Sequence, residues 1–343
     1  MTDKACSALV GLDNPHSTGW LTTLQHCEAV GRLVVCGEGE CAGVDQVYGS
    51  IDKLLAGEAL EFALVCTRND RAPVLAAQLL EAGVPVIVEK PVARTAAEIA
   101  RLNEIAAAKQ LIWATAFMNR SHPIVLKTRE LIASGVLGEI VSIEGRMVTS
   151  TVQQRDPDHW LFDMATAGGG ILHWLAIHTV DLIRHISGLE YQSVAAHKAT
   201  LSDTGIDVED IIAASFSMNN GAIGNIHAGY VLTRRYGDIY LCFRGTDGDA
   251  TWQMYDWDGK SDRLLVQSKA EGWTDDDYRH FDLTVGEAPG YGGANGWAFI
   301  ADFIAASRGQ GTFITDGDDA YQAMRFVEAA YNAADTGSQG KLA

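Results

Sequence analysis

The first third of the chain alternates between short apolar runs and stretches with helical periodicity. Apolar runs of strand length occur at residues 8–12, 33–36, 62–66, 86–88 and 111–114, and amphipathic helical patterns lie between some of them, as at 72–82 and 96–109. Near-continuous apolar strands separated by such helices are typical of a parallel sheet that helices cover on both faces. We therefore predict a doubly wound, Rossmann-type α/β domain, whose ligand binds at the carboxyl ends of the strands.

The pattern changes after about residue 122. Beyond a helical pattern at 124–134, short turns such as Asn219-Asn220-Gly221 and Asp247-Gly248 join the strand candidates and favour antiparallel pairing. These candidates lie at 140–148, 211–218, 222–230, 239–244, 250–255 and 264–266, and further helices are predicted at 170–186, 297–307 and 318–334. We predict an α+β domain with a mixed, mainly antiparallel open sheet and helices on one face. The expected domains are residues 1–122 and 123–343, and the C-terminal helices can pack back on the first.

Composition narrows the classes of partner and compartment. The chain of 343 residues has a formal net charge of −18, which argues against nucleic acid and anionic membranes as partners. Its six scattered cysteines indicate buried thiols in a reducing compartment, and their spacing matches no zinc site. No apolar run reaches the ~20 residues needed to span a bilayer, and the N-terminus lacks the pattern of a secretory leader. We therefore expect a cytoplasmic protein without a metal site.

The first apolar strand ends in a partial match to the dinucleotide-binding pattern G-x-G-x-x-G. Only Gly11 is in register, and Asp13 and His16 occupy the other two glycine places. Asn14 tolerates unusual backbone angles, so the segment can still form a tight turn that exposes backbone N–H groups at a helix start. An ordinary strand-to-helix turn is the equal alternative.

An acidic side chain follows the second predicted strand. Glu38 lies where a carboxylate can bind the diol of a ribose and repel a 2′-phosphate. No Arg or Lys lies nearby in the sequence to receive such a phosphate, so we favour NAD over NADP. The alternative is that Glu38 and Glu40 are solvated loop charges.

A longer segment resembles a known protein family. The strand at 62–66 leads into a T-x-N turn with Thr67 and Asn69, a helix, an Ala-Gly pair, an apolar strand and then Glu89-Lys90-Pro91. This order resembles the Gfo/Idh/MocA family, the glucose–fructose oxidoreductase and inositol dehydrogenase group, in which an E-K-P box closes this strand. The resemblance continues through residues 117–120, 134–140, 168–170, 302–303 and 327–331, and so covers nearly the whole chain.

The resemblance implies an NAD(P)-dependent oxidoreductase. It implies that residues 1–122 bind the dinucleotide and that residues 123–343 bind substrate and form a dimer or tetramer through the open sheet face. The implied reaction is hydride transfer between nicotinamide and a secondary alcohol or ketone of a sugar, polyol or related small molecule. The expected cofactor-binding residues are Gly11, Asp13, Asn14, Glu38, Thr67, Asn69, Glu89, Lys90, Pro91 and Asn119.

Lys90 and His178 are the expected catalytic residues. A lysine at the end of a parallel strand points into the nicotinamide cleft, where burial and the positive ring lower its pKa. Such an amine can hydrogen-bond a substrate hydroxyl and move its proton. By the resemblance, His178 occupies the position of the family's catalytic histidine and can take or relay that proton. A surface lysine and a satisfied core histidine are the alternatives.

One position departs from the family pattern. The family usually has an Asp four residues before the histidine, and here Trp174 stands in its place. An indole offers an apolar platform, on which sugars stack, and one N–H donor, although simple packing is the alternative. Trp174, His178 and Asp181 share one helix face, so Asp181 is placed to orient the imidazole, and a helix-surface or capping role is the equal alternative. The expected substrate-binding residues are Trp174, Arg120, His159, Trp160, Asp181 and His173.

Other polar residues have two interpretations. The loop 155–160 suits either a lid over a polyol or acid sugar, or an ordinary surface loop, and Tyr230, Arg234 and Arg235 have the same ambiguity. Two other functions are also open. One is a redox-assisted elimination or hydrolysis of a glycoside without net NADH formation. The other is a non-catalytic nucleotide-binding sensor, which the eroded glycine pattern and missing Asp favour and the retained Lys90 and His178 oppose.

Overall fold

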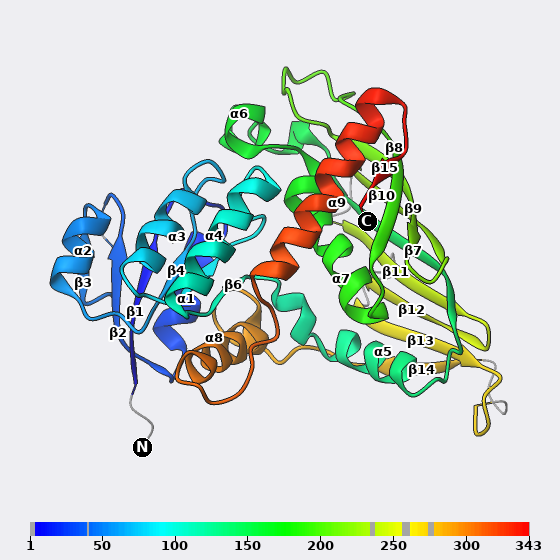
Figure 1. Ribbon diagram of the computed structural model, residues 1–343, viewed down its shortest axis with the longest axis horizontal. Helices are drawn as coiled ribbons and strands as arrows, with labels where there is room; N and C mark the ends of the chain where they lie inside the picture. The colour runs from blue at the N-terminus through cyan, green and yellow to red at the C-terminus, as the bar shows by residue number, and fades with distance from the viewer. Residues whose placement is uncertain (1–3, 40, 234–236, 256–260, 274–277, 343) are drawn as a thin grey trace. The chain divides into compact units, whose positions relative to one another are not determined.

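Internal contacts divide the chain into two units. The computed structural model describes residues 4–39, 41–233, 237–255, 261–273 and 278–342 (Figure 1). The first unit comprises Met1–Ser121 and Val285–Gln322, and the second comprises His122–Thr284 and Ala323–Ala343. The segment Val285–Gln322, which lies within the second expected domain, therefore groups with the first unit, and the division falls inside the last long helix.

The first unit is built on a six-stranded parallel sheet. The strand order is β3-β2-β1-β4-β5-β6, and every pair is parallel. The strands are β1 (Ala5–Val10), β2 (Val30–Cys36), β3 (Gln46–Tyr48), β4 (Phe62–Val65), β5 (Val86–Val88) and β6 (Trp113–Thr115). Since β1 and β4 are neighbours in the centre, the chain winds outward from them in both directions, as the predicted doubly wound fold requires.

Helices cover both faces of this sheet (Figure 1). Trp20 and Leu24 of one helix and Phe299 and Phe303 of another are buried in one core with strand residues such as Leu9. These helices are α1 (Ser17–His26) and α8 (Gly293–Ser307); the others are α2 (Ile51–Gly57), α3 (Ala72–Glu81) and α4 (Ala96–Lys109), with a 3₁₀ turn, η1, at Met118–Ser121. This core fixes the ends of the strands, and the turns of the candidate site begin at these ends.

The second unit is built on a nine-stranded mixed sheet. Its order is β14-β13-β12-β11-β7-β10-β9-β8-β15, and among the described strands β7 and β10 form its one parallel pair. The strands are β7 (Ile140–Ser150), β8 (Tyr191–Ala199), β9 (Ile211–Met218), β10 (Ile223–Leu232), β11 (Gly237–Gly245), β12 (Gly248–Tyr255), β13 (Ser261–Ser268), β14 (Arg279–Asp282) and β15 (Gly340–Lys341). The predicted mainly antiparallel sheet is confirmed, including the hairpins at both predicted turns.

One face of the nine-stranded sheet is covered by helices and the other is open. The second unit contains α5 (Pro123–Ala133), the short α6 (Met164–Ala167), α7 (Ile177–Ser187) and the end of α9 (Gly317–Thr336). On the covered face, Phe326 of α9 packs against Tyr191 and Phe216 of the sheet. Along β9 the buried residues alternate with exposed Ala213 and Ser215, so the side of this strand that faces away from the core carries small side chains.

The helix predicted at 170–186 is not continuous. A π-helical segment at Leu172–Ala176 precedes α7, which begins at Ile177. The strands β3, β8, β14 and β15 were not predicted, because they are short or contain few branched apolar residues. Trp174 lies in the π-helical segment, and His178 follows it in α7. π-helical turns occur often at functional sites.

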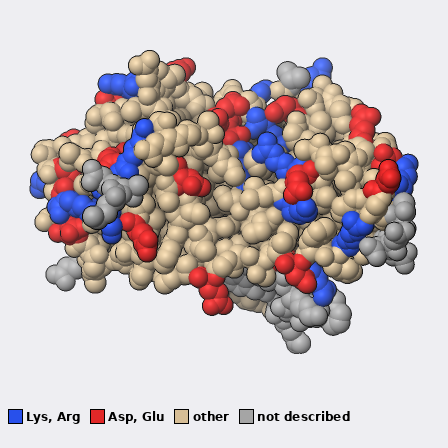
Figure 2. Space-filling view, turned by 90° about the horizontal axis from the view of Figure 1, so that it is seen from below, with Lys and Arg blue, Asp and Glu red and all other residues tan. Residues whose placement is uncertain are grey.

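The described surface is mixed in charge. On the face in Figure 2, acidic and basic side chains are interspersed and separated by neutral surface. This face differs from the uniformly basic surface that binds a phosphate backbone. Among the helices of the described residues, none combines the length and the apolar character required to cross a membrane.

Candidate functional site

The turn after β1 requires a glycine. Gly11 has φ +92°, and a Cβ atom there would lie 2.5 Å from Thr67 Cβ and 2.8 Å from Cys66 O. Its N–H donates to Cys36 O at 2.9 Å. The backbone at Gly11 therefore lies against the loop that follows β4, and a side chain would prevent this approach.

Three of the expected cofactor-binding residues lie together at these two loops. The hydroxyl of Thr67 donates to the Asp13 carboxylate at 2.5 Å, and the Asn14 amide donates to Thr67 O at 3.3 Å. His16 N donates to the Asn14 side chain at 2.9 Å, just before α1 begins. These hydrogen bonds connect the turn after β1 to the loop after β4, although Asp13 and His16 occupy two of the glycine places of the pattern.

A pocket of about 620 Å³ lies at the carboxyl ends of β1 and β2. Gly11, Asp13 and Glu38 line it, and so does Arg71 at the start of α3. This corrects the expectation that no basic residue is near Glu38, because Arg71 is remote in sequence but borders the same pocket. The guanidinium of Arg71 also lies 3.5 Å from the Asp13 carboxylate. Glu40 lies outside the described residues.

This pocket fits part of a dinucleotide. A glycine turn at a helix start can approach a pyrophosphate closely, and a carboxylate after the second strand can accept from ribose hydroxyls. Gly11 and Glu38 supply these two features on one pocket wall. The residues present are therefore those that a nicotinamide dinucleotide would require at this edge of the sheet.

Lys90 follows β5 and is almost completely buried, with 1% of its surface exposed. Burial lowers the pKa of this amine to about 8, against the opposing effect of the neighbouring Glu89 carboxylate. The peptide bond between Lys90 and Pro91 is cis, and Val92 N donates to Glu89 O at 3.0 Å across the turn. An amine with this pKa exchanges a proton readily near neutral pH.

The Glu89 carboxylate is held by residues that the sequence did not single out for this role. Trp20 Nε1 donates to it at 2.6 Å, and His16 Nδ1 lies 2.8 Å from its other oxygen. The His16 ring stacks on Tyr291, with 4.4 Å between ring centroids. The substitution of His16 for the third glycine was the available signal, but its partner lies 73 positions away.

The remaining expected residues of the first unit differ in their surroundings. Thr67 and Asn69 are buried, as is Pro91, while Asn119 is half-buried in η1. Arg120 is buried, and its Nη1 lies 2.6 Å from Asp319 and donates to Ile314 O at 3.1 Å. The described contacts of Arg120 thus fix the segment before α9, and a substrate contact by this residue stays a prediction.

In the second unit, three expected substrate-binding residues form an aromatic row. Trp174, 4% exposed, meets Trp160 edge to face with 5.8 Å between ring centroids, and His159 lies 5.4 Å from Trp160. The π-helical segment supplies Trp174, and the loop before α6 supplies the other two. Since aromatic faces and edges bind sugar C–H groups and hydroxyls, this row suits a polyol ligand.

The other expected polar residues of this unit are also buried. His173, His178 and Asp181 are 0%, 9% and 2% exposed. Asp181 lies close enough to Tyr191 for its charge, after burial, to raise the pKa of that phenol. The three side chains thus belong to a low-dielectric interior in which a histidine or carboxylate is strongly affected by its neighbours.

The loop residues have structural partners. Arg155 stacks on Tyr230 at 4.9 Å from its ring and donates to the Thr149 and Ser150 hydroxyls. Arg234 and Arg235 lie outside the described residues. Within the described ranges, no group of three or more His, Cys, Asp or Glu side chains is placed to hold a metal ion.

Glu209 was missed by the sequence analysis. Its carboxylate, buried at 4% exposure, accepts from Gly170 N at 2.7 Å, Leu172 N at 3.0 Å and the Tyr331 hydroxyl at 2.7 Å. Burial raises the pKa of Glu209 above its ordinary value. No local pattern in the sequence could identify Glu209 as a site residue, because its three partners lie 39, 37 and 122 positions away.

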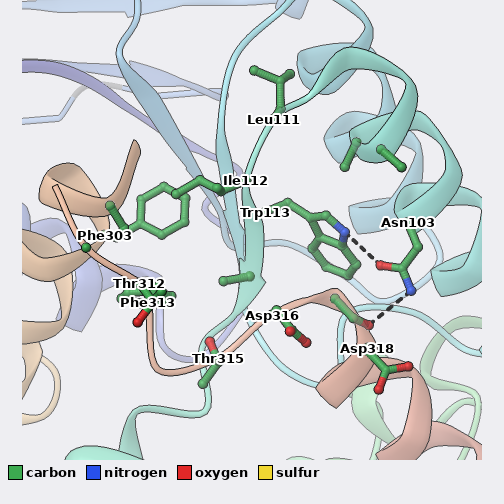
Figure 3. Close-up of a pocket in the computed structure, with 16 residues that line it drawn as sticks. Asn103, Leu111, Ile112, Trp113, Phe303, Thr312, Phe313, Thr315, Asp316 and Asp318 are labelled. Atoms are coloured by element: carbon green, nitrogen blue, oxygen red, sulfur yellow. Dashed lines mark hydrogen bonds between the residues drawn. The ribbon is translucent and has the colours of Figure 1, made fainter. Parts of the chain in front are cut away.

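A second pocket of about 620 Å³ lies beside β6 (Figure 3). Trp113 Nε1 donates to Asn103 Oδ1 at 2.9 Å, and the Asn103 amide donates to Gly317 O at 3.2 Å along its wall. None of its lining residues is among those predicted for the site. The glycine turn and Glu38 instead line the pocket at β1 and β2.

Comparison with known proteins agrees with this geometry. Residues 32–117 match the model "Oxidoreductase family, NAD-binding Rossmann fold", and residues 125–251 match the "GFO/IDH/MocA C-terminal domain". Together these ranges span more than half of the chain. The two models lie in the order expected from the two sheets.

Curated relatives match over part of their length. Levoglucosan dehydrogenase of Pseudarthrobacter phenanthrenivorans is 28% identical over 54% of this chain and 53% of its own. Inositol 2-dehydrogenase of Rhizobium meliloti is 26% identical over 51% of this chain and 53% of its own. The chain thus spans about half the length of the curated relatives it matches.

Solved structures share the whole fold. Levoglucosan dehydrogenase in complex with NADH superposes with a TM-score of 0.87 at 21% identity, covering 99% of this chain and 100% of that one. GenD2 from gentamicin A biosynthesis in complex with NAD gives a TM-score of 0.82 at 24% identity, covering 100% and 98%. With both of its domain models matched in order, the chain belongs to the Gfo/Idh/MocA family of oxidoreductases, whose NAD-binding Rossmann fold is the first unit.

Proposed function

We propose that the protein is an NAD(P)-dependent dehydrogenase or reductase that acts on a secondary alcohol or ketone of a sugar, polyol or related small molecule. The observation that carries this proposal is the buried amine of Lys90, which follows a parallel strand and has a pKa of about 8. A buried amine without a chemical task is costly, so its retention at this strand end supports a role in proton transfer.

The first unit supplies the cofactor site in this proposal. Gly11, Asp13 and Asn14 shape the turn for the pyrophosphate, and Glu38 binds the adenosine ribose. The loops after β4 and β5 complete the site with Thr67, Asn69, Glu89, Lys90, Pro91 and, beyond β6, Asn119. The bound nicotinamide supplies hydride transfer. The carboxylate of Glu38 favours NAD, although Arg71 on the same wall gives NADP a possible partner.

Lys90 and His178 handle the substrate proton. In its neutral form the Lys90 amine accepts a hydrogen bond and then the proton from the substrate hydroxyl. His178 takes or relays this proton in turn, and Asp181 orients it.

The aromatic row favours a substrate with a sugar-like ring. Trp174 and Trp160 provide a platform, and His159, His173 and Arg120 are proposed to contact hydroxyl groups. The names of the relatives, levoglucosan dehydrogenase and inositol 2-dehydrogenase, point to the same class of substrate. Trp174 in place of the family's usual Asp transfers the proton work to Lys90 and His178.

We further propose a cytoplasmic homo-oligomer, a dimer or tetramer. All six cysteines lie in the described residues and carry free thiols, as in a reducing compartment. The open face of the nine-stranded sheet, with small residues such as Ala213 and Ser215, permits a flat contact with a second copy. Neither nucleic acid nor membrane is among the proposed partners.

A substrate screen tests the proposed reaction. Purified protein with NAD⁺ or NADP⁺ is offered a panel of sugars and polyols, including levoglucosan and inositol, and reduced nicotinamide is followed by absorbance. We expect a steady increase with at least one panel member. Substrate consumption without net absorbance change would identify redox-assisted elimination or hydrolysis instead. Tight nucleotide binding without turnover of any panel member would overturn the proposal in favour of a sensor.

A further inference from the structure

One residue accepts hydrogen bonds from three successive N–H groups at the start of a helix. Gly170 N donates to Glu209 Oε2 at 2.7 Å, Ile171 N to the main-chain oxygen of Glu209 at 3.2 Å, and Leu172 N to Glu209 Oε1 at 3.0 Å. The first N–H groups of a helix have no partner within it. Glu209, from the segment before β9, supplies these partners and so fixes where the helix begins.

The chemistry of this anchor requires a carboxylate. Backbone N–H groups approach both carboxylate oxygens of Glu209, and the Tyr331 hydroxyl donates to Oε1 at 2.7 Å. An amide of the same shape has an oxygen at one end only, and its NH₂ end would face an N–H group. Glutamine therefore preserves the volume of this side chain but cannot make the same set of hydrogen bonds.

The anchor also explains why a glycine lies at position 170. A Cβ atom on Gly170 would lie 1.8 Å from the main-chain oxygen of Glu209 and 2.9 Å from its Oε2. Atoms cannot approach this closely, so any other residue would push the two segments apart. Gly170 and Glu209 thus form one close-packed joint in the interior of the second unit.

The anchored segment contains Trp174 and leads to His178, two residues that have roles in the proposed reaction. It is π-helical from Leu172 to Ala176 and continues as α7 from Ile177. Trp174 lies two residues after Leu172, the last residue with an anchored N–H group, and His178 lies six residues after Leu172. The three hydrogen bonds to Glu209 come from residues 170–172, where this turn begins, so they fix the point from which it starts.

We propose that Glu209 is a positioning residue for the reaction, which fixes the start of the segment that presents Trp174 and His178. This inference rests on the proposed function, because it assigns importance to the orientation of those two side chains. Glu209 does not contact the substrate in this role. It acts through the helix that it anchors.

The test compares Glu209→Gln with a matched control, Glu190→Gln, which removes an exposed carboxylate of the same unit that pairs with Arg184. For Glu209→Gln we expect a ten- to hundredfold loss of kcat, with nucleotide Kd within twofold of wild type, because the nucleotide residues lie in the first unit. Hydrogen exchange of the amides at 170–172 should accelerate. The Glu190→Gln control should match wild type in all three measurements.

A Glu209→Gln protein that is folded and shows faster exchange at 170–172 but wild-type kcat would overturn the inference. If Glu209→Gln does not fold, Tyr331→Phe replaces it, since that change removes one bond to the carboxylate and leaves both side-chain bonds to the backbone. Tyr331→Phe should lower kcat two- to tenfold with unchanged nucleotide Kd, and an unchanged kcat would again overturn it. A wild-type protein without turnover on any substrate would instead refute the proposed function, while hydrogen exchange would still report on the anchor.

Discussion

The indole N–H of Trp20 donates a 2.6 Å hydrogen bond to the carboxylate of Glu89, one residue before the buried amine of Lys90. Glu89 is 3% exposed, so its charge acts through protein interior on its neighbour. Two opposing effects therefore set the charge of Lys90. Burial lowers the pKa of the amine, the Glu89 charge raises it, and burial prevails at a pKa of about 8.

Lys90→Met should abolish most of the turnover. The change keeps a long apolar stem but removes the group that accepts the substrate proton, and positioned general bases contribute about 10²- to 10⁴-fold. We expect kcat/KM to fall by about that factor. Lys109→Met, which alters an exposed lysine at the end of α4, is the control and should behave as wild type. Near-normal turnover in Lys90→Met would remove Lys90 from the mechanism.

The pKa of Lys90 also predicts how stability depends on pH. The folded pKa of about 8 lies below the ordinary lysine pKa of 10.5, so between these values the unfolded chain binds more protons than the folded one. Stability from this group therefore rises with pH across that window and is lowest below pH 8, where the buried amine must be charged. The shift corresponds to about 3 kcal/mol.

Denaturant unfolding of wild type and Lys90→Met measures this difference directly. The free energy of unfolding of wild type minus that of Lys90→Met should increase by about 3 kcal/mol between pH 7 and about pH 10.5. Other titrating groups are shared by both proteins and cancel in the comparison. A constant difference across the window would show that Lys90 is not charged and buried as described.

Glu89→Gln should move the pH dependence of turnover to lower pH. The amide oxygen can still accept from Trp20, but the negative charge that raises the pKa of Lys90 is gone. The amine should then be neutral at lower pH, so the acid limb of kcat/KM for alcohol oxidation should shift downward. A profile that superposes on that of wild type would mean that Lys90 does not set this limb.

Local patterns predicted most of the fold. The strand at Ile211–Met218 and the helix at Ala96–Lys109 have the predicted bounds. The turn at residues 219–221 ends the strand and a Thr95–Glu98 capping box begins the helix, and both signals are local. Strand β8 was missed because Tyr191–Ala199 contains three alanines and few branched residues. The π-helical turn was missed because residues 171–177 are apolar at nearly every position, so no period stands out.

The candidate site was only partly visible in the sequence. Glu89 and Lys90 follow a recognisable apolar strand, and Gly11 ends another. The partners of these residues are long-range: His16 meets Glu89, Glu209 meets Gly170, and Arg71 borders the pocket of Glu38. Such pairs are created by the sheet topology, which brings strand ends together regardless of their separation in the chain. Single-sequence periodicity contains no information on them.

The last prediction concerns the turn after β1. Gly11→Ala places a Cβ 2.5 Å from Thr67 Cβ on a backbone with φ +92°, so the loops after β1 and β4 must separate. Gly83→Ala is the matched control, because Gly83 has φ +87° but no atom within 4 Å of the added Cβ.

The control should lose about 1–2 kcal/mol of stability from the left-handed backbone alone. Gly11→Ala should lose more stability than Gly83→Ala, and its nucleotide Kd should rise at least tenfold, because the separated loops no longer shape the pyrophosphate turn. Thermal unfolding and a nucleotide titration measure both effects. Equal nucleotide affinity in the two variants would mean that the cofactor does not bind in the pocket at β1 and β2. The clash at Thr67 distorts that pocket and leaves the pocket beside β6 untouched.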